Sequence, residues 1–473
     1  MTGRQIAGLP VSNMEGSGQM GAVADKLGGI MRLLTGGGDD ESRARSGALF
    51  TFAIRIASAA LAFFSQVLLA RWLGTFDFGV YTYVWVWINV LGTLCTVGLS
   101  STSVRFLAEY AKPHLHGLLR GFLRFGRVTS FAAGALAAGA GYAILHLAPC
   151  FAKDHYHIPL SIALLALPAF ALTDFHDGVG RGRSWIGLAF VPPYILRPLL
   201  LLIFIAALVI VGGERNATSA AAALVAATWI TAGVQFFLLH RRFGQDHPAS
   251  MARQYRPRLW LGVSVPLLLM ESFALLMMNI DVLLLERFVQ PDRIAIYFAA
   301  ARTISFISFI HFAVSAVAMP RFAAAFTQRD TSAAAAYLVK FRAWTLWPSV
   351  ALAVILLTFG KFILALFGPA FPAAWPVMFA LVAGHLTRAV AGPAESLLMV
   401  SGHQVYTAVI TGLTAALNIA FNLALIPRYG LIGAGLATAA AFAFQSAALT
   451  VASRRVLEEG FHTKGSGMAG EAA

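Results

Sequence analysis

Long apolar segments recur along the whole chain, and no other feature constrains its fold as strongly. A helix that crosses the hydrocarbon core of a bilayer needs about 20 mostly apolar residues. The sequence therefore predicts an all-α integral membrane protein with twelve transmembrane helices. Their expected extents are 48–70, 78–102, 122–148, 158–179, 185–211, 218–240, 259–285, 293–320, 342–367, 373–400, 404–426 and 430–453.

Composition agrees with a membrane protein and bears on its partners. Of the 473 residues, 58% are hydrophobic and 12% are charged, whereas about 25% of the residues of soluble proteins are charged. The formal net charge of +14 would suit nucleic-acid binding. In a membrane protein, however, surplus Lys and Arg chiefly set the orientation of the helices. We therefore expect the lipid bilayer, and no nucleic acid, as a partner.

Lys and Arg are distributed unequally between the two sides of the predicted membrane, and cytoplasmic loops carry the excess. The side that holds both tails also holds most of the basic loop residues, so both termini are predicted to be cytoplasmic. The loops on the other side are short, which argues against an external catalytic domain. These outer loops hold Arg71, Lys153, Arg215, Arg287, Arg293, Lys361 and Arg428.

The chain is predicted to consist of two halves. A shift that places Arg71 on Arg287 also places Tyr81 on Tyr297. Such a repeat predicts two six-helix bundles related by an axis along the membrane normal. The expected parts are a mostly disordered cytoplasmic tail (1–47), the first bundle (48–240), a basic cytoplasmic linker (241–258), the second bundle (259–453) and a cytoplasmic tail (454–473).

Charged residues inside the predicted helices are the candidate functional residues, because a charge at the centre of a spanning helix costs at least about 2.5–3.5 kcal/mol. Arg55 and Glu271 fall on equivalent positions of the two halves, where they would form either an ion pair or the wall of a charged cavity. Asp281 lies near the end of its helix, and simple solvation is the alternative there. The candidates are Arg55, Arg197, Glu271, Asp281, Arg302, Arg388 and Glu395, with His311 and His385 as further polar positions.

The stretch NIAFNLALIPRYGLIGAGLATAAA, residues 418–441, predicts a helical hairpin with a polar seam. Asn418 and Asn422 lie one turn apart on one helix face, which favours interhelical hydrogen bonds. Pro427 ends one helix and Gly430 lets the chain reverse. Small residues follow at every turn, and they permit close packing of the second helix.

Motifs for catalysis, cofactors and metals are absent from the sequence. It has no GxxxxGK[ST] phosphate loop and no HExxH, and two cysteines do not make a cysteine-based zinc site. We therefore expect no enzyme activity, no cofactor and no metal. Any work would draw on an ion gradient, a membrane potential or downstream consumption of a substrate.

Several stretches resemble one family of membrane proteins over roughly residues 48–453. VLLARWLGTFDFGVYTYVWVW (67–87) and GLSSTSVRFLAEY (98–110) are similar to the opening hairpin of the polysaccharide repeat-unit flippases. These belong to the multidrug/oligosaccharidyl-lipid/polysaccharide (MOP) exporter superfamily. The 418–441 stretch and SLLMVSGHQVY (396–406) resemble a second marker of the same family. Both markers are structural in character, so they indicate family more than substrate.

The resemblance implies two MATE-like six-helix bundles around a cavity that opens to alternate sides of the bacterial inner membrane. The implied substrate is an undecaprenyl-pyrophosphate-linked oligosaccharide for lipopolysaccharide or exopolysaccharide synthesis. Further expected partners are a polysaccharide polymerase and chain-length and export machinery. A diphosphate needs cationic partners, which the resemblance assigns to the cavity residues Arg55, Arg197, Arg302 and Arg388.

Two other function classes compete with this interpretation. Ion-coupled multidrug antiporters of the same superfamily often use a carboxylate in the first span, whereas residues 46–70 here have no acid and carry Arg55. Polysaccharide polymerases are expected to have long periplasmic loops, which this chain lacks. The cation-coupled multidrug antiporter remains the alternative. Glu271, Asp281 and Glu395 are the candidates for ion coupling or for ion pairing, and Glu271 is the preferred titratable switch.

Overall fold

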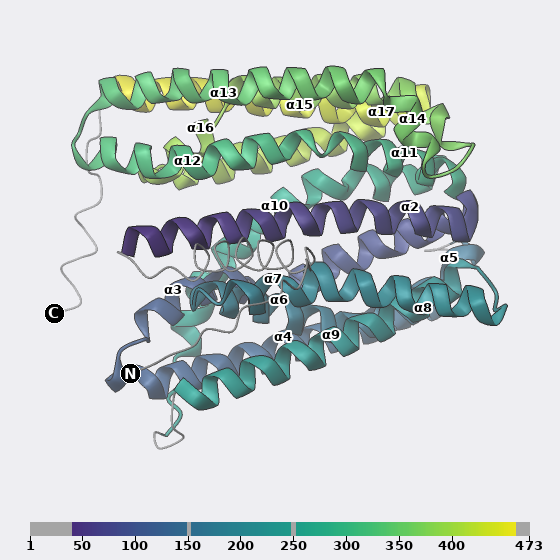
Figure 1. Ribbon diagram of the computed structural model, residues 1–473, viewed down its shortest axis with the longest axis horizontal. Coiled ribbons are helices and arrows are strands. Elements are labelled where there is room, and N and C mark those ends of the chain that lie inside the picture. Colours follow the sequence, from purple (N-terminus) through teal and green to yellow (C-terminus); the bar gives the residue numbers. More distant parts are fainter. Residues whose placement is uncertain (1–39, 149–152, 247–251, 460–473) are drawn as a thin grey trace, which may run out of the picture. The chain divides into compact units, whose positions relative to one another are not determined.

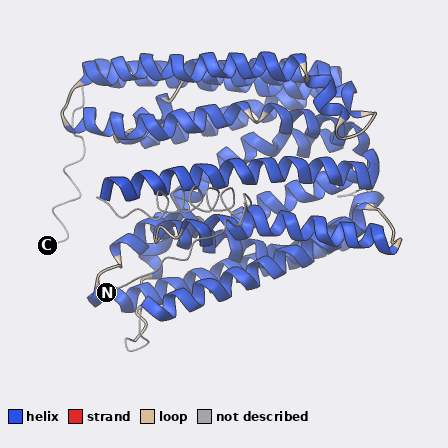
Figure 2. Ribbon diagram, in the orientation of Figure 1, coloured by secondary structure: helices blue, strands red, loops and turns tan. Residues whose placement is uncertain are grey.

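The computed structural model describes residues 40–148, 153–246 and 252–459, which are almost entirely helical and contain no strand (Figures 1 and 2). The predictions for the N-terminal tail fall mostly outside these residues. The longer helices are α2 (Asp40–Leu94), α3 (Leu99–Glu109), α4 (His116–Leu147), α5 (Asp154–Ala163), α6 (Leu167–Gly182), α8 (Arg197–Val211), α9 (Ala217–Asp246), α10 (Pro257–Phe288), α11 (Pro291–Ile304), α12 (Ile307–Thr327), α13 (Thr331–Thr358), α15 (Trp375–Ala391) and α17 (Gln404–Glu459). The short helices are α7 (Ile186–Val191), α14 (Gly360–Ala365) and α16 (Ala394–Val400).

The chain forms two compact units, Met1–Ala59 and Ala60–Ala473. The described part of the first unit is the beginning of α2, and it contains Arg55. All contacts between helices that follow lie within the second unit.

Ten helices in the described part of the chain are long and apolar enough to cross a membrane. Two of them, Ile54–Glu109 and Gln404–Glu459, have 56 residues each, and each covers most or all of two predicted spans. Each is interrupted by a non-helical glycine, Gly74 in α2 and Gly430 in α17. The predicted all-α membrane fold is confirmed, and the number of twelve spans stays a prediction.

The break in α17 is a tight hairpin at Gly430, where the sequence predicts that the chain reverses, but Pro427, which the sequence predicts to end the first helix, lies inside it. Gly430 has φ 57° and ψ −130°, a backbone conformation that glycine adopts without the penalty of a Cβ atom. A Cβ atom on Gly433 would lie 2.3 Å from the carbonyl oxygen of Leu425. A continuous helix holds residues eight positions apart at about 12 Å along its axis, so the chain reverses between Leu425 and Gly433.

The helices of the second unit pack in two groups (Figure 1). In one group α6 contacts α3, α4 and α9, and α8 packs on α9. In the other group α15 contacts α13 and α17, and α12 contacts α13 and α16. Helix α10 belongs to both, because it contacts α3 of the first group and α17 of the second.

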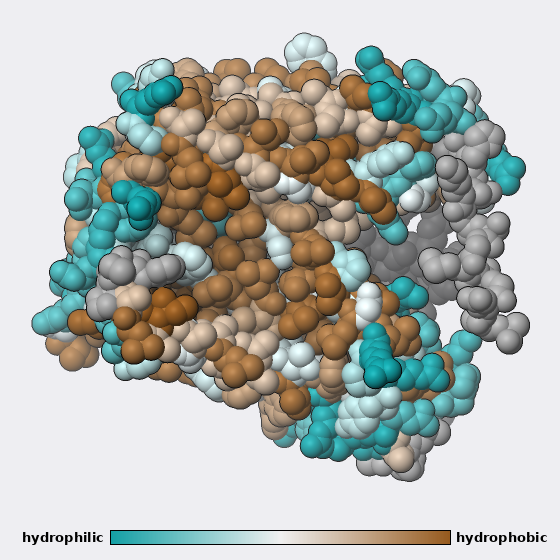
Figure 3. All heavy atoms as spheres, turned by 180° about the vertical axis from the view of Figure 1, so that it is seen from behind, coloured by the Kyte–Doolittle hydropathy of each residue, from teal (hydrophilic) through white to brown (hydrophobic). Residues whose placement is uncertain are grey.

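The outer surface of the helices is apolar. Leu136, Ile210 and Val211 are 75%, 84% and 85% exposed, and Figure 3 shows hydrophobic residues across the middle of one face with hydrophilic residues toward both ends. Exposed apolar area of this extent is unfavourable in water, at about 25 cal/mol per Å². The surface suits the hydrocarbon core of a bilayer, as expected of a multi-pass membrane protein.

Candidate functional site

Helix α10 is tied to α3 by polar side chains along its first half. The indole of Trp260 donates to the hydroxyl of Tyr110 at 3.1 Å. The hydroxyl of Ser264 donates to that of Thr102 at 2.9 Å, and both residues are buried. A buried polar group that loses its hydrogen-bond partner destabilises the protein. These pairs therefore fix the position of α10 against α3.

A glycine makes this contact possible. Gly98, which precedes α3, has φ 71°, and a Cβ atom there would lie 2.2 Å from the carbonyl oxygen of Ser264. Any other residue would separate α3 from α10. The chain stretch around Gly98 is therefore built for close approach of the two helices.

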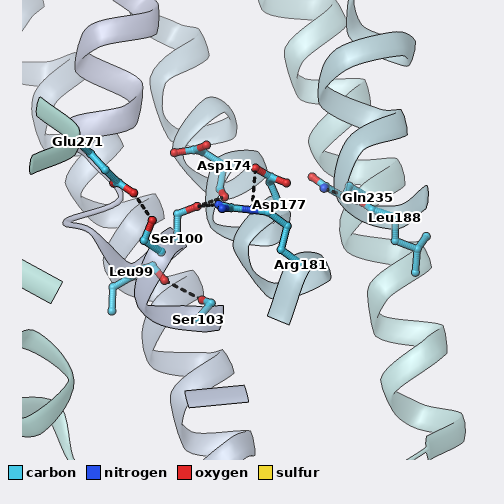
Figure 4. A network of polar contacts seen from close by, with 10 residues as sticks. Leu99, Ser100, Ser103, Asp174, Asp177, Arg181, Leu188, Gln235 and Glu271 are labelled. Carbon is cyan, nitrogen blue, oxygen red and sulfur yellow. Dashed lines mark hydrogen bonds and ion pairs between the residues drawn. The ribbon is translucent and has the colours of Figure 1, made fainter. Parts of the chain in front are cut away.

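Two turns after Ser264 on α10, Glu271 lies beside a group of charged residues on α6 (Figure 4). Ser101 on α3 donates a hydrogen bond to the Glu271 carboxylate. In Figure 4 the Asp174 carboxyl points toward the side of Glu271 and away from Asp177. Asp174 also interacts electrostatically with Glu271, Asp177, Arg181 and Arg197.

Arg181 organises the α6 side of this group. Its guanidinium Nε lies 3.5 Å from an Asp177 carboxylate oxygen, one helical turn away. Its Nη2 donates to the hydroxyl of Ser100 at 3.1 Å, and that hydroxyl donates to the carbonyl of Asp174 at 2.8 Å. The result is a chain of polar contacts that runs from α6 through α3 to α10, and it is called the α6–α10 charged group below.

Sequence reasoning overlooked Asp174 and Asp177. Both lie within the predicted span 158–179, so the rule that charges inside spans are functional candidates would have selected them. The predicted Arg55–Glu271 pair stays a prediction. Arg55 lies in the first unit, where its carbonyl accepts a hydrogen bond from Ser58 at 2.9 Å.

Asp281, in the second half of α10, is buried rather than solvated. It is 8% exposed. One carboxylate oxygen accepts hydrogen bonds from Tyr297 and Thr438, both at 2.6 Å, and the other accepts from Asn422 at 2.8 Å. Asn422 and Thr438 lie on opposite arms of the α17 hairpin. The carboxylate therefore joins α10 and α11 to both arms.

The two asparagines of the predicted polar seam are both fully buried beside Asp281. Asn422 donates to the backbone carbonyl of Asn418 at 3.0 Å and also contacts the Asn418 side chain. The amide of Asn418 approaches the sulfur of Met277 on α10 at 3.8 Å. These contacts place the seam at the α10–α17 interface.

The remaining candidate arginines lie against aromatic rings. Arg197 lies 4.6 Å from the ring centroid of Phe170 and 5.2 Å from that of Trp85. It follows a π-helical turn, Pro192–Leu196, which begins with two prolines that cannot donate backbone hydrogen bonds. Aromatic faces attract cations, and they hold this guanidinium between α2, α6 and α8.

Arg388 lies on α15 of the second group of helices, and Arg302 lies on α11, which packs against α15. Arg302 is 4.8 Å from the ring of Phe298, and Arg388 is 5.5 Å from that of Phe442. The ring of His385 also contacts Phe442, and Arg388 interacts electrostatically with His385 and His311. Glu395 lies apart from these residues, half-buried in the first turn of α16.

A further set of contacts joins the two groups of helices at the end that bears the predicted outer loops. The guanidinium of Arg71 donates to the carbonyls of Leu366 and Ala365. The ammonium of Lys153 donates to the carbonyl of Glu286 at 2.6 Å and lies 3.2 Å from its carboxylate. We call these contacts the outer latch.

Within the described residues, no group of His, Cys, Asp and Glu side chains is placed to hold a metal ion.

Comparison with known proteins assigns the chain to a family. A family model described as polysaccharide biosynthesis protein matches residues 44–326. No curated protein sequence matches the chain.

Several solved structures of transporters and flippases are similar to this one. An inward-facing multidrug resistance MATE family transporter of the MOP superfamily is 12% identical, with a TM-score of 0.71 over 86% of this chain and 98% of that one. The lipid II flippase MurJ in an inward closed conformation is 14% identical, with a TM-score of 0.70 over 86% of this chain and 87% of that one. A MOP superfamily transporter from Pyrococcus furiosus, reported to have a binding pocket of reverse polarity, is 14% identical, with a TM-score of 0.63 over 90% and 97%.

These identities are low, so the structures establish the fold alone, which is MATE-like as the sequence predicts. The family match covers more than half of the 473 residues. The chain is therefore a member of the polysaccharide biosynthesis protein family, with the fold of the MOP-superfamily transporters.

Proposed function

We propose that this protein is a flippase that moves undecaprenyl-pyrophosphate-linked oligosaccharide repeat units from the cytoplasmic to the periplasmic leaflet of the bacterial inner membrane. The product would serve lipopolysaccharide or exopolysaccharide synthesis. The observation that carries the proposal is the family match over residues 44–326. A protein of similar fold, MurJ, is described as a lipid II flippase.

The proposed mechanism is alternating access. The two groups of helices would move relative to each other, with α10 as the connection, because its first half is tied to α3 and its second half to α17. Opening toward the periplasm would break the outer latch. The lipid tail would stay in the bilayer while the sugar head crosses between the two groups.

Arginines would bind the diphosphate of the substrate. Guanidinium groups form bidentate hydrogen bonds to phosphate oxygens, and an Arg that lies on an aromatic ring is already positioned for them. Arg197, Arg302 and Arg388 all lie on such rings. With Arg55, these are the proposed substrate contacts, and Glu271 is the proposed titratable group.

The alternative is a cation-coupled multidrug antiporter. The observation in its favour is the group of carboxylates at Asp174, Asp177 and Glu271, which suits a cationic substrate better than a diphosphate. The neighbouring Arg181 and Arg197 offset these charges, so we place the flippase first.

Deletion of the gene separates the two functions. The flippase proposal predicts that lipid-linked oligosaccharide accumulates and that surface polysaccharide is lost. The wild type and Arg428→Ala, which removes an exposed arginine outside the proposed site, should restore the polysaccharide, whereas Arg197→Ala should not. The antiporter predicts normal lipid-linked oligosaccharide and increased sensitivity to cationic drugs. Mass spectrometry of the lipid extract would also identify the sugar.

A further inference from the structure

We propose that a cavity between α7 and the end of α9 binds the headgroup of an anionic glycerophospholipid. The cavity has a volume of about 440 Å³ and is lined by Trp185, Ile186, Gly187, Leu188, Leu238, Arg241 and Arg242. Arg241 and Arg242 begin the basic linker, so the cavity opens at the side predicted to be cytoplasmic. We call it the α7–α9 pocket.

The charge of the pocket fits a phosphate. The Arg241 guanidinium lies 4.2 Å from the ring of Phe237, and that of Arg242 lies 5.7 Å from the ring of Trp185. Among the side chains that the structure describes, neither arginine forms a salt bridge with a carboxylate. Two guanidinium groups from neighbouring residues, held on aromatic rings and without an acidic partner among the described side chains, present a favourable site for one phosphate.

The walls of the pocket are fixed by hydrogen bonds. The amide of Trp185 donates to the carbonyl of Gly180 at 2.8 Å, which fixes the turn after α6. The side chain of Gln235 on α9 is buried and donates to the carbonyl of Leu188 at 3.0 Å. The ring of Trp185 also packs edge-on against Phe243 at 4.8 Å. Helix α9 is therefore anchored to α7 through Gln235 and to the residue before α7 through Phe243.

The rest of the pocket is apolar and continues onto the surface that faces lipid. Ile186, Leu188 and Leu238 line it beside the arginines. Leu238 is 39% exposed and the neighbouring Phe237 is 50% exposed. A ligand that combines a phosphate with acyl chains would use both parts of the site, whereas free phosphate would use only the arginines. Basic pockets between helices on the cytoplasmic side bind anionic lipid headgroups in other membrane proteins.

Native mass spectrometry of the purified full-length protein tests this site with phosphatidylglycerol as the probe. We expect Arg241→Gln/Arg242→Gln to bind phosphatidylglycerol about tenfold more weakly than the wild type, because each basic residue contributes to anionic-lipid binding. Gly187→Trp should have the same effect by filling the cavity, since a Cβ atom at Gly187 meets nothing within 4 Å. This variant leaves both arginines in place, so it separates the pocket from charge alone.

The matched control is Arg454→Gln/Arg455→Gln, which removes another adjacent, exposed arginine pair near the end of α17. Its lipid binding should equal that of the wild type. The proposal would be overturned if the control pair weakened phosphatidylglycerol binding equally, or if Gly187→Trp left it unchanged. It would also be overturned if phosphatidylcholine bound equally well, or if millimolar inorganic phosphate displaced the lipid. The experiment measures no transport, so its outcome is independent of the proposed flippase activity.

Discussion

The buried carboxylate of Asp281 connects α10 to α11 and to both arms of the α17 hairpin. Its three donors come from α11 and from both arms of α17. Asp281→Ala would leave three buried donors without an acceptor, each at a cost of about 1–3 kcal/mol. We expect a clearly lower midpoint of thermal unfolding in detergent for Asp281→Ala and a smaller loss for Asp281→Asn, in which hydroxyl groups can reorient. A melting midpoint of Asp281→Ala equal to that of the wild type would show that these hydrogen bonds do not stabilise the hairpin.

Arg197 allows the role of charge to be separated from that of geometry. Lysine keeps the positive charge but lacks the planar guanidinium that stacks on Phe170 and binds phosphate through two hydrogen bonds. A lost charge-assisted hydrogen bond costs about 1.5–3 kcal/mol. We therefore expect Arg197→Lys to restore roughly a tenth of the surface polysaccharide at equal protein level, and Arg197→Ala less. Full restoration by Arg197→Lys would mean that only charge matters at this position.

At the scale of elements, the α17 hairpin depends on a residue without a side chain. A Cβ atom at Gly433 would collide with the Leu425 carbonyl, whereas one at Gly262 on α10 would meet nothing within 4 Å. Gly433→Val should therefore reduce the amount of folded protein in the membrane. Fluorescence-detected size-exclusion chromatography of the detergent extract measures this amount. Gly262→Val is the control and should fold normally. Equal yields of the two variants would contradict the close packing of the hairpin arms.

The outer latch is expected to act on conformation rather than on stability. Exposed ion pairs contribute only about 0–1 kcal/mol, and the Lys153 side chain is 44% exposed. Spin labels at positions 76 and 362, in place of Phe76 and Phe362, would report the distance between α2 and α14 by double electron–electron resonance. We expect Lys153→Ala/Arg71→Ala to add longer distances, while Lys361→Ala, which removes a cation from the ring of Trp375 at the same end, leaves the distribution unchanged. A latch variant with the wild-type distribution would contradict this role.

Hydropathy predicted the positions of most helices, and Gly430 predicted the reversal of the chain, because both follow from the local sequence. It could not predict that α10 belongs to two groups of helices. That property depends on contacts of Ser264 with Thr102 and of Asp281 with Asn422, which join segments about 140–160 residues apart and leave no periodic signal. The same holds for the α6–α10 charged group, whose members come from three helices. The sequence also could not predict that Arg197 stacks on Phe170, because the two residues lie on different helices.

At the scale of the whole molecule, the central claim is translocation of a lipid-linked oligosaccharide, and reconstitution into liposomes tests it most directly. Undecaprenyl-pyrophosphate oligosaccharide would be placed in the inner leaflet, and its appearance outside would be followed with a membrane-impermeant oxidant of the sugar. We expect transfer well above that of protein-free vesicles, and a rate near the protein-free level for Arg197→Ala/Arg388→Ala. Transfer at the protein-free rate by the wild type, together with movement of a cationic dye, would contradict the flippase and favour the antiporter.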